Sequence, residues 1–293
     1  MQKPKIALII GILCISVFPI LVKLNLTPGL ISAFYRMAFA LVILTPIALF
    51  LKKFKIPSLP QIALAFLCGI LFGSDVAVWN ISIQESSATQ ASLLTNLSPI
   101  WVGIASFLWL KPKPKINFWI GTLIAFIGMV TLVGFQIFSE LNFDKAFNFG
   151  ILSGIFYAAY LLISKKILTQ IDVISFMILS LFASTIHLGI ICLITNEPFT
   201  GFSSEGWMVL VIQAVVCQLG AWLLISYTTQ HMKATTISLS LLAQAIITAV
   251  MAYLFLNEQI SLQMILGGLI LLLGIRITFL EHNLSLKKIL KPQ

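Results

Sequence analysis

The sequence predicts an all-α membrane protein, built from ten transmembrane helices in two inverted five-helix repeats. Two observations support this fold class. First, 59% of the 293 residues are hydrophobic and only 9% are charged, whereas a soluble domain carries about a quarter charged residues. The mean hydropathy of +1.06 agrees, and in lipid a helix of about 20 apolar residues satisfies its own backbone. Second, the chain contains an internal duplication.

The duplication is clearest in the segment that begins Gln84-Glu-Ser-Ser-Ala-Thr-Gln-Ala-Ser-Leu, which matches Gln230-His-Met-Lys-Ala-Thr-Thr-Ile-Ser-Leu. At the same shift, two glycines of the first copy fall on two of the second. At a slightly smaller shift Gly11 falls on Gly154 and Trp79 on Trp222. Self-similarity at a fixed long shift is typical of an internal duplication.

Apolar segments long enough to cross a bilayer follow one another along the whole chain. Several connections between them are only a few residues long, so neighbouring helices must run as antiparallel hairpins. The predicted helices cover residues 6–22, 29–51, 61–83, 88–110, 117–138, 148–168, 173–195, 206–228, 235–256 and 261–281.

The distribution of lysines predicts the orientation. Lysines cluster at alternate connections and at both ends of the chain, and by the positive-inside rule this side is cytoplasmic. An odd number of helices per copy then places the copies in opposite orientations. We expect a first repeat over 1–138, an external linker over 139–147 and a second repeat over 148–293. The basic clusters are Lys3 and Lys5, Lys52 to Lys55, Lys111 to Lys115, Lys165 and Lys166, Lys233, and Lys287 to Lys291.

Several functional classes find no support in the sequence. The net charge of +9 lies in short clusters between apolar runs, which indicates topology and not nucleic-acid binding. All four cysteines lie inside apolar runs, so we expect neither disulfides nor a metal site. Because zinc-protease, serine-hydrolase and Walker A motifs are missing from the sequence, we expect no enzyme activity, no ATP-driven pumping and no cofactor.

Polar residues at membrane depth are the candidate functional residues, because inverted-repeat transporters bind their substrates near the midplane. Asp75 is the foremost candidate, since a central acid costs about 2.5–3.5 kcal/mol on insertion scales. Arg36 is predicted at the same depth on the adjacent helix, roughly 12–14 Å from the external end. The two residues form either a structural ion pair or a site that handles protons or substrate.

Aromatic and amide side chains extend this candidate site. Asp75 and Trp79 are four residues apart on one helix face, and Gln218 and Trp222 repeat that spacing in the second copy. A polar group beside a flat ring suits an amphipathic metabolite, although the two tryptophans could simply pack. Four further residues could hydrogen-bond either a ligand or another helix: Asn96, Tyr157, Tyr160 and Gln244.

Glycines of the fifth and tenth predicted helices favour close helix packing or a homodimer. They are Gly121, Gly128, Gly267, Gly268 and Gly274.

Four motifs are informative about the family: Phe34-Tyr35-Arg36, the segment from Ala88 to Pro99, Ala234-Thr-Thr-x-Ser-Leu, and Leu254-Phe-Leu-Asn-Glu258. In these motifs, and over nearly its whole length, the sequence resembles an EamA-type member of the drug/metabolite transporter superfamily. One departure is that Leu110-Lys111-Pro112 stands where the family's pattern expects a Glu after the fourth helix. The resemblance implies a secondary transporter with a central cavity, often an exporter of amino acids, nucleosides or other small metabolites.

We therefore expect alternating-access export of a small organic metabolite across the bacterial inner membrane. Helices one, three and four and their repeats six, eight and nine would line the cavity, with proton coupling through Asp75. The alternatives are an uncoupled facilitator, with Asp75 kept ionised by Arg36, and a membrane-embedded lipid-modifying enzyme or lipid scramblase. Neither the substrate nor the coupling ion is encoded in a recognisable motif.

Overall fold

The fold was obtained as a computed structural model that describes residues 2–85, 94, 96–109, 113–134, 145–256 and 259–280. Within these ranges all regular structure is helical, as the composition predicts. The helices are α1 Gln2–Ser16, α2 Phe18–Lys23, α3 Gly29–Phe50, α4 Leu59–Glu85, α6 Ser98–Trp109, α7 Ile116–Val133, α9 Lys145–Ile167, α10 Val173–Ile194, α11 Ser204–Ile212, the π-helix η1 Gln213–Gly220, α12 Ala221–His231, α13 Ala234–Ser240, α14 Ala243–Leu256 and α15 Leu262–Thr278.

Eight helical segments in the described part of the chain are long and apolar enough to cross a membrane. Two shorter apolar helices, α6 and α15, fall within the predicted segments 88–110 and 261–281. Several predicted features lie outside the described residues: most of the Ala88 to Pro99 motif, Lys111, linker residues 139–144, Glu258 and the lysines after residue 280.

Three segments predicted as single helices are interrupted. Pro19 lies at the start of α2, just after the break between α1 and α2, and a proline offers no backbone N–H to continue a helix. The segment 206–228 becomes α11, η1 and α12, and the segment 235–256 divides into α13 and α14. Between α13 and α14 the N–H of Leu242 donates a hydrogen bond to the carbonyl of Leu239, which makes a tighter turn than that of an α-helix.

Helix starts follow polar capping residues at the connections. Asp172 accepts a hydrogen bond from the N–H of Ser175 at 2.9 Å and caps α10. Ser203 and Ser261 cap α11 and α15 in the same way. Such caps satisfy N–H groups that the first helical turn leaves unpaired.

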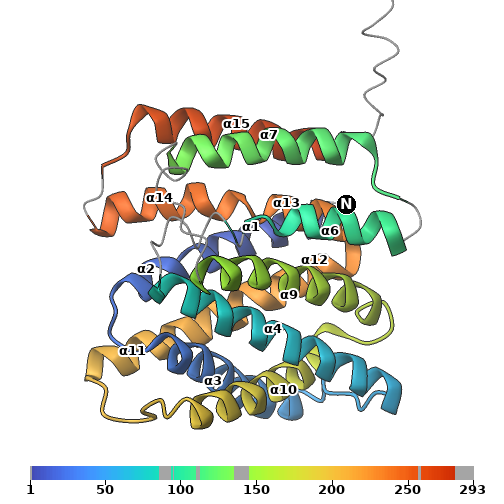
Figure 1. Cartoon of the computed structure of the whole chain (residues 1–293). Coiled ribbons are helices and arrows are strands. Elements are labelled where there is room, and N and C mark those ends of the chain that lie inside the picture. Colours follow the sequence, from blue (N-terminus) through green and yellow to red (C-terminus); the bar gives the residue numbers. More distant parts are fainter. Residues whose placement is uncertain are drawn as a thin grey trace, which may run out of the picture.

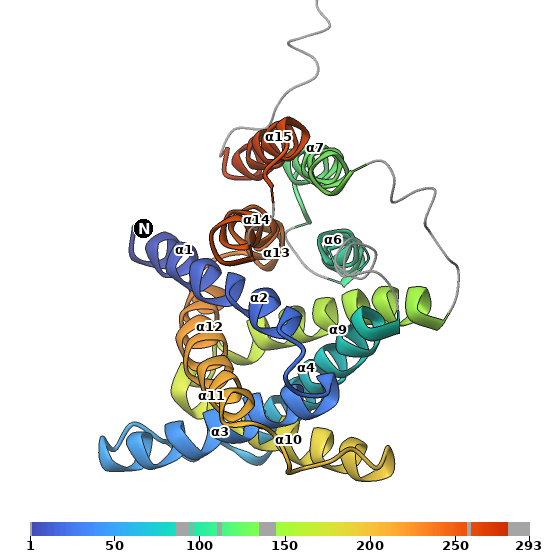
Figure 2. The same cartoon turned by 90° about the vertical axis from the view of Figure 1, so that its left-hand side faces the viewer.

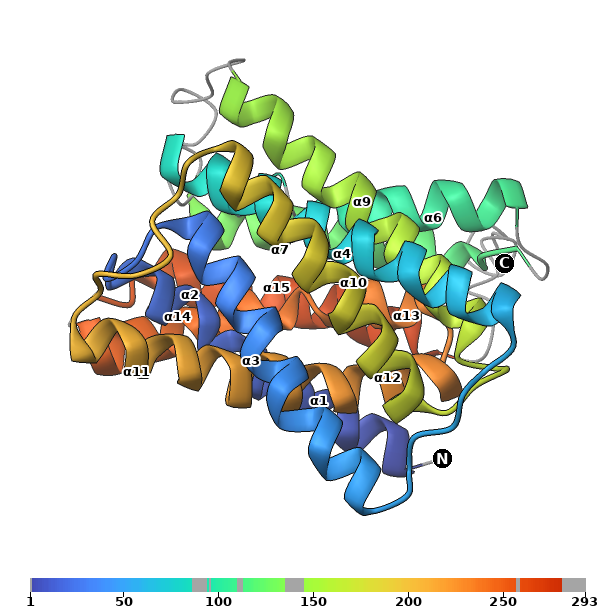
Figure 3. The same ribbon diagram turned by 90° about the horizontal axis from the view of Figure 1, so that it is seen from below.

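The helices lie side by side in layers (Figure 1). The pair α7 and α15 forms one edge of the molecule, and α6 with α13 and α14 separates that pair from the other helices (Figure 2). Viewed from the opposite edge, α10 crosses α3 and α4 (Figure 3). In the middle, α4 packs on α9 and α1 packs on α12. A cavity lies between these central helices and the layer that contains α14.

Glycines hold α7 and α15 close together. A side chain at Gly121 would collide with the carbonyl of Gly274, and one at Gly128 would collide with the backbone of Leu271. Small residues allow helix backbones this near approach in a membrane. The predicted packing role of these glycines is therefore confirmed inside the subunit, whereas a homodimer stays a prediction. Gly268 differs because it faces Ile246 of α14 at ordinary contact distance.

Candidate functional site

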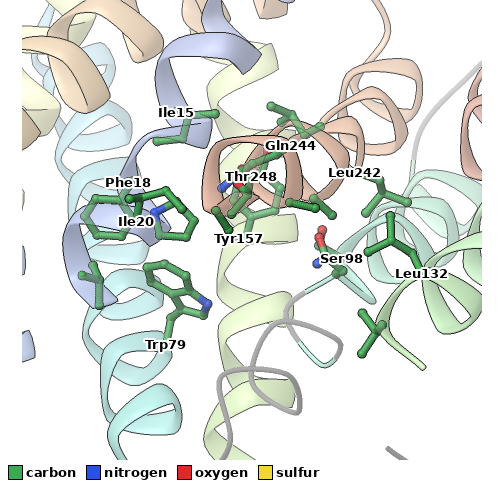
Figure 4. Close-up of a pocket in the computed structure, with 18 of the residues that line it drawn as sticks. Ile15, Phe18, Ile20, Trp79, Ser98, Leu132, Tyr157, Leu242, Gln244 and Thr248 are labelled. Carbon is green, nitrogen blue, oxygen red and sulfur yellow. The ribbon is translucent and has the colours of Figure 1, made fainter. Parts of the chain in front are cut away.

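A cavity of about 660 Å³ lies between the two halves of the chain. This volume is in the range of pockets that bind small organic molecules, about 300–1,000 Å³. Figure 4 shows Phe18 of α2 and Trp79 of α4 on one wall, with Gln244 and Thr248 of α14 across from them. Tyr157 of α9 also lines the cavity.

Most of the candidate residues meet at this cavity. The lining includes Arg36, Asp75, Trp79, Asn96, Tyr157, Trp222 and Gln244. Tyr160 and Gln218 are buried behind the wall, where they contact lining residues. Asn96 lies in the turn just before α6 and Gln244 lies in the first turn of α14, and both amides line the cavity.

Arg36 is held from the second half of the chain. Its Nε donates to the side-chain oxygen of Gln218 at 2.8 Å, and its Nη2 donates to the carbonyl of Cys217 at 3.4 Å. The guanidinium also lies over the ring of Phe18, 4.3 Å from the ring centroid. Only 2% of Arg36 is exposed, so these neutral groups replace most of its water.

Asp75 has a hydrogen-bond partner that the sequence analysis did not single out. Its Oδ1 accepts a hydrogen bond from the hydroxyl of Ser153 on α9 at 2.6 Å. Within the described residues, Asp75 and Arg36 form no direct ion pair, although both line the cavity. The helix η1 offers an amide oxygen to the arginine, and α9 offers a hydroxyl to the acid. Ser153 carried no signal in the sequence that could have singled it out.

The aromatic residues form two groups around the cavity. Trp79 stacks on Phe18 with ring centroids 5.2 Å apart. Trp222 packs against Phe72 at 4.5 Å, Tyr160 at 5.6 Å and Tyr157 at 6.3 Å. The two phenylalanines were not predicted as site residues, because a phenylalanine in an apolar helix gives no distinguishing pattern.

Two polar atoms in the wall have no hydrogen-bond partner within the described residues. They are the hydroxyl of Tyr157 and the indole N–H of Trp222, and both are buried. A buried donor without a partner costs about 1–3 kcal/mol. Such groups are suited to a ligand that supplies the missing acceptor.

Comparison with known proteins gives the family. The profile of the EamA-like transporter family matches residues 3–134 and again residues 145–280. The chain belongs to the EamA-like transporter family.

Two relatives of this EamA-like protein are named as uncharacterized transporters, and a third is named as a WAT1-related protein. It is 24% identical to the uncharacterized transporter YdfC of Bacillus subtilis, over 80% of this chain and 76% of that protein. It is 27% identical to the uncharacterized transporter sll1164 of Synechocystis, over 69% of this chain and 60% of that protein. The WAT1-related protein At5g40210 of Arabidopsis thaliana is 21% identical over 87% of this chain and 81% of its own length.

A solved crystal structure shares the fold. It superposes with a TM-score of 0.78 over 95% of this chain and 97% of that chain, at 12% sequence identity. This likeness shows the fold alone. The family match and the apolar helices identify a multi-pass membrane protein of the transporter type.

The π-helix of this EamA-like transporter connects the cavity to α3. Besides the bond from Arg36 to Gln218, the hydroxyl of Ser32 donates to the side-chain oxygen of Gln213 at 2.7 Å. Both glutamines belong to η1 and both bonds reach α3. π-Helical turns are rare and often occur at functional sites. The π-helix therefore offers the side-chain oxygen of Gln213 to Ser32 and that of Gln218 to Arg36.

His187 lies away from the cavity lining. Its Nε2 is 2.9 Å from the hydroxyl of Ser74, so α10 and α4 are linked by a hydrogen bond at this point. This contact is a helix-packing contact, and it gives His187 no role in the site.

Proposed function

We propose that the protein is a secondary transporter that exports a small organic metabolite across the bacterial inner membrane by alternating access. The observation that carries the proposal is the cavity itself, because it places an acid, a guanidinium, amides and aromatic rings inside an otherwise apolar helical bundle. Ionisable residues at membrane depth are costly and usually mark substrate or ion pathways. The family match supports transport as the general activity.

We further propose ten transmembrane helices in two inverted repeats, over 1–138 and 148–293, with 139–147 as an external linker and both termini cytoplasmic. Separate family matches to residues 3–134 and 145–280 support this division. Helix packing supports it as well. The contact of α4 with α9 has its counterpart, after exchange of the two halves, in the contact of α12 with α1.

The orientation can be tested with reporter fusions. A reporter after Lys55 or Lys113 should be active in the cytoplasm, and a reporter at Phe143 should be active outside. A cytoplasmic reporter signal at Phe143 would contradict the inverted arrangement.

Proton coupling through Asp75 is the mechanism that we favour. Its carboxyl lies in the wall of the cavity with the hydroxyl of Ser153 as its hydrogen-bond donor. A carboxyl in such a place can be neutral in one conformation and ionised in another, which would tie proton movement to the change of access. The same site with Asp75 always ionised would give an uncoupled facilitator.

The test begins with the substrate. Metabolites in the medium and in cells should be compared with and without overexpression, and a compound that accumulates outside identifies both substrate and direction. In proteoliposomes loaded with that compound, Asp75→Asn should abolish the response to a pH gradient and retain part of the exchange. Asp172→Asn is the matched control, because Asp172 caps α10 outside the cavity and asparagine also caps helices.

The outcomes separate the alternatives. Full gradient-driven transport by Asp75→Asn would exclude this residue as an essential proton carrier and favour a facilitator. A wild-type protein that moves no metabolite but alters lipid composition or sidedness would favour the lipid enzyme or scramblase.

A further inference from the structure

We propose that Arg36 is the anion-binding group of the cavity and that the transported metabolite carries a carboxylate, which Arg36 receives. This inference rests on the proposed transport function and adds the substrate class. Four properties of the molecule support it: the incomplete pairing of Arg36, the separate pairing of Asp75, the support of Arg36 by η1, and the aromatic walls.

The pairing of Arg36 leaves donors available. A guanidinium has five N–H donors, and the two hydrogen bonds that Arg36 forms use Nε and Nη2. Both acceptors, an amide oxygen and a carbonyl, are neutral. A cation that is 98% buried at membrane depth normally has an ionic partner or a water-filled cavity beside it. Arg36 lines the cavity, so an anion in the cavity can meet its remaining N–H groups.

Asp75 is not the direct partner of Arg36. One oxygen of its carboxylate accepts a hydrogen bond from the hydroxyl of Ser153. Within the described residues, no hydrogen bond or ion pair joins Asp75 to Arg36. The guanidinium is therefore free to form charge-assisted hydrogen bonds with a ligand carboxylate, a geometry that arginine matches with two parallel bonds. The acid in the same cavity disfavours a doubly charged phosphate more than a singly charged carboxylate.

Gln218 is the positioning residue for this site. Its side-chain oxygen holds Nε while Phe18 covers the guanidinium at 4.3 Å. These contacts come from two different elements, η1 and α2, and together they fix the plane of the guanidinium. A guanidinium whose orientation is already fixed loses less conformational freedom on binding a carboxylate than a mobile guanidinium does.

The remainder of the cavity suits a flat apolar body. Phe18 and Trp79 stack on each other, and both line the cavity together with Arg36 and Asp75. Tyr157 is a third aromatic residue of the lining (Figure 4). The unpartnered hydroxyl of Tyr157 and indole N–H of Trp222 are further donors, and a carboxylate offers only acceptors. The donors of this site therefore match an anion better than a cation.

The test uses binding to the purified full-length protein in lipid nanodiscs, with three probes of equal size. Radiolabelled benzoate is the anion, benzamide the neutral analogue and benzylamine the cation. Benzoate should bind saturably and about tenfold more tightly than benzamide, as expected for one charge-assisted pair. Benzylamine should compete least well. Arg36→Gln should abolish the preference for benzoate, whereas Arg276→Gln, which changes an exposed arginine of α15, should leave it unchanged.

A second variant keeps the test decisive if Arg36→Gln fails to fold. Gln218→Glu places a carboxylate on the Nε side of Arg36, so the protein's own anion competes with benzoate. We expect its benzoate affinity to fall at least about tenfold while its thermal unfolding temperature is maintained. Equal binding of benzoate and benzamide, tighter binding of benzylamine, or no saturable benzoate binding would overturn the anion site.

These results are separable from the transport proposal. A protein that exports its metabolite but shows no preference for benzoate refutes only the anion site. A protein that binds benzoate through Arg36 but moves no metabolite refutes only the transport function.

Discussion

The helix α4 around Asp75 and Trp79 and the segment η1 to α12 around Gln218 and Trp222 have matching residue spacing but different structures. The first is one continuous α-helix, whereas the second contains a π-helix. Asp75 lines the cavity, and Gln218 lies behind its wall as the acceptor for Arg36. Trp79 is half-buried beside Phe18, while Trp222 is 6% exposed among three aromatic rings.

The two copies therefore contribute unequally to the residues around the cavity. The first half provides the charges that face the cavity, and the second half provides the groups that hold them, Gln218 for Arg36 and Ser153 for Asp75. In contrast, α7 and α15 keep equivalent glycines in equivalent contacts. Of these two regions, the central residues are therefore unequal, whereas the glycines of α7 and α15 are equivalent.

The two tryptophans should differ most. Trp222→Ala removes a buried ring from a cluster of Phe72, Tyr157 and Tyr160, and should lower the free energy of unfolding by about 3–5 kcal/mol. Trp79→Ala removes a half-buried ring and should cost only about 1–2 kcal/mol. Thermal unfolding in detergent measures both changes. Equal losses would mean that the two positions are equivalent in the folded protein.

The second-largest effect should be the coupling energy between Arg36 and Gln218. A double-mutant cycle with Arg36→Met and Gln218→Leu should give a coupling energy of about 1.5–3 kcal/mol, as for a buried hydrogen bond to a charged group. A second cycle with Arg36→Met and Asp75→Asn should give less than about 1 kcal/mol, because these residues do not touch. A larger coupling energy for Arg36 with Asp75 than for Arg36 with Gln218 would instead support a direct ion pair between Arg36 and Asp75.

Equivalent glycines of α7 and α15 should respond alike. Gly128→Ala and Gly274→Ala should each destabilise the protein by about 1–3 kcal/mol, since the added methyl group collides with backbone atoms of the partner helix. Gly268→Ala is the control, because its methyl group would meet Ile246 no closer than 3.6 Å. That variant should be neutral or slightly more stable. Unlike effects at Gly128 and Gly274 would extend the asymmetry to the edge of the molecule.

Ser153→Ala should have the smallest effect, about 1 kcal/mol, because the freed oxygen of Asp75 still faces the cavity. Ile10 occupies the corresponding position of the first half, so this support for a charged residue exists only once. Ser164→Ala, in the same helix, removes a bond to the carbonyl of Leu161 and serves as the control. A change in pH-gradient-driven uptake should accompany Ser153→Ala only. A Ser153→Ala variant with unchanged coupling would show that this hydroxyl merely packs.

Much of the fold could be read from the sequence because lipid imposes a simple rule. Each crossing needs a long apolar run, so the bounds of α3 at Gly29–Phe50 and α10 at Val173–Ile194 lie close to the predicted ranges. The interruptions were not predicted, because hydropathy is the same for a continuous and a divided helix. Pro19 is a sequence signal that could have indicated the first of them. The π-helix was also missed, since it changes no residue type.

The composition and order of residues determined the membrane class, the duplication and the polar residues at depth. Which of those residues are in contact depends on the tertiary structure. Arg36 and Gln218 are 182 residues apart in the chain, and Asp75 and Ser153 are 78 apart. Hydrogen-bond partners depend on atomic positions within about 3 Å, and these positions follow from helix packing and from the π-helical turn. The sequence pattern places a residue on a helix and at a depth, but a neutral amide and a carboxylate at that depth can reach the same arginine equally well.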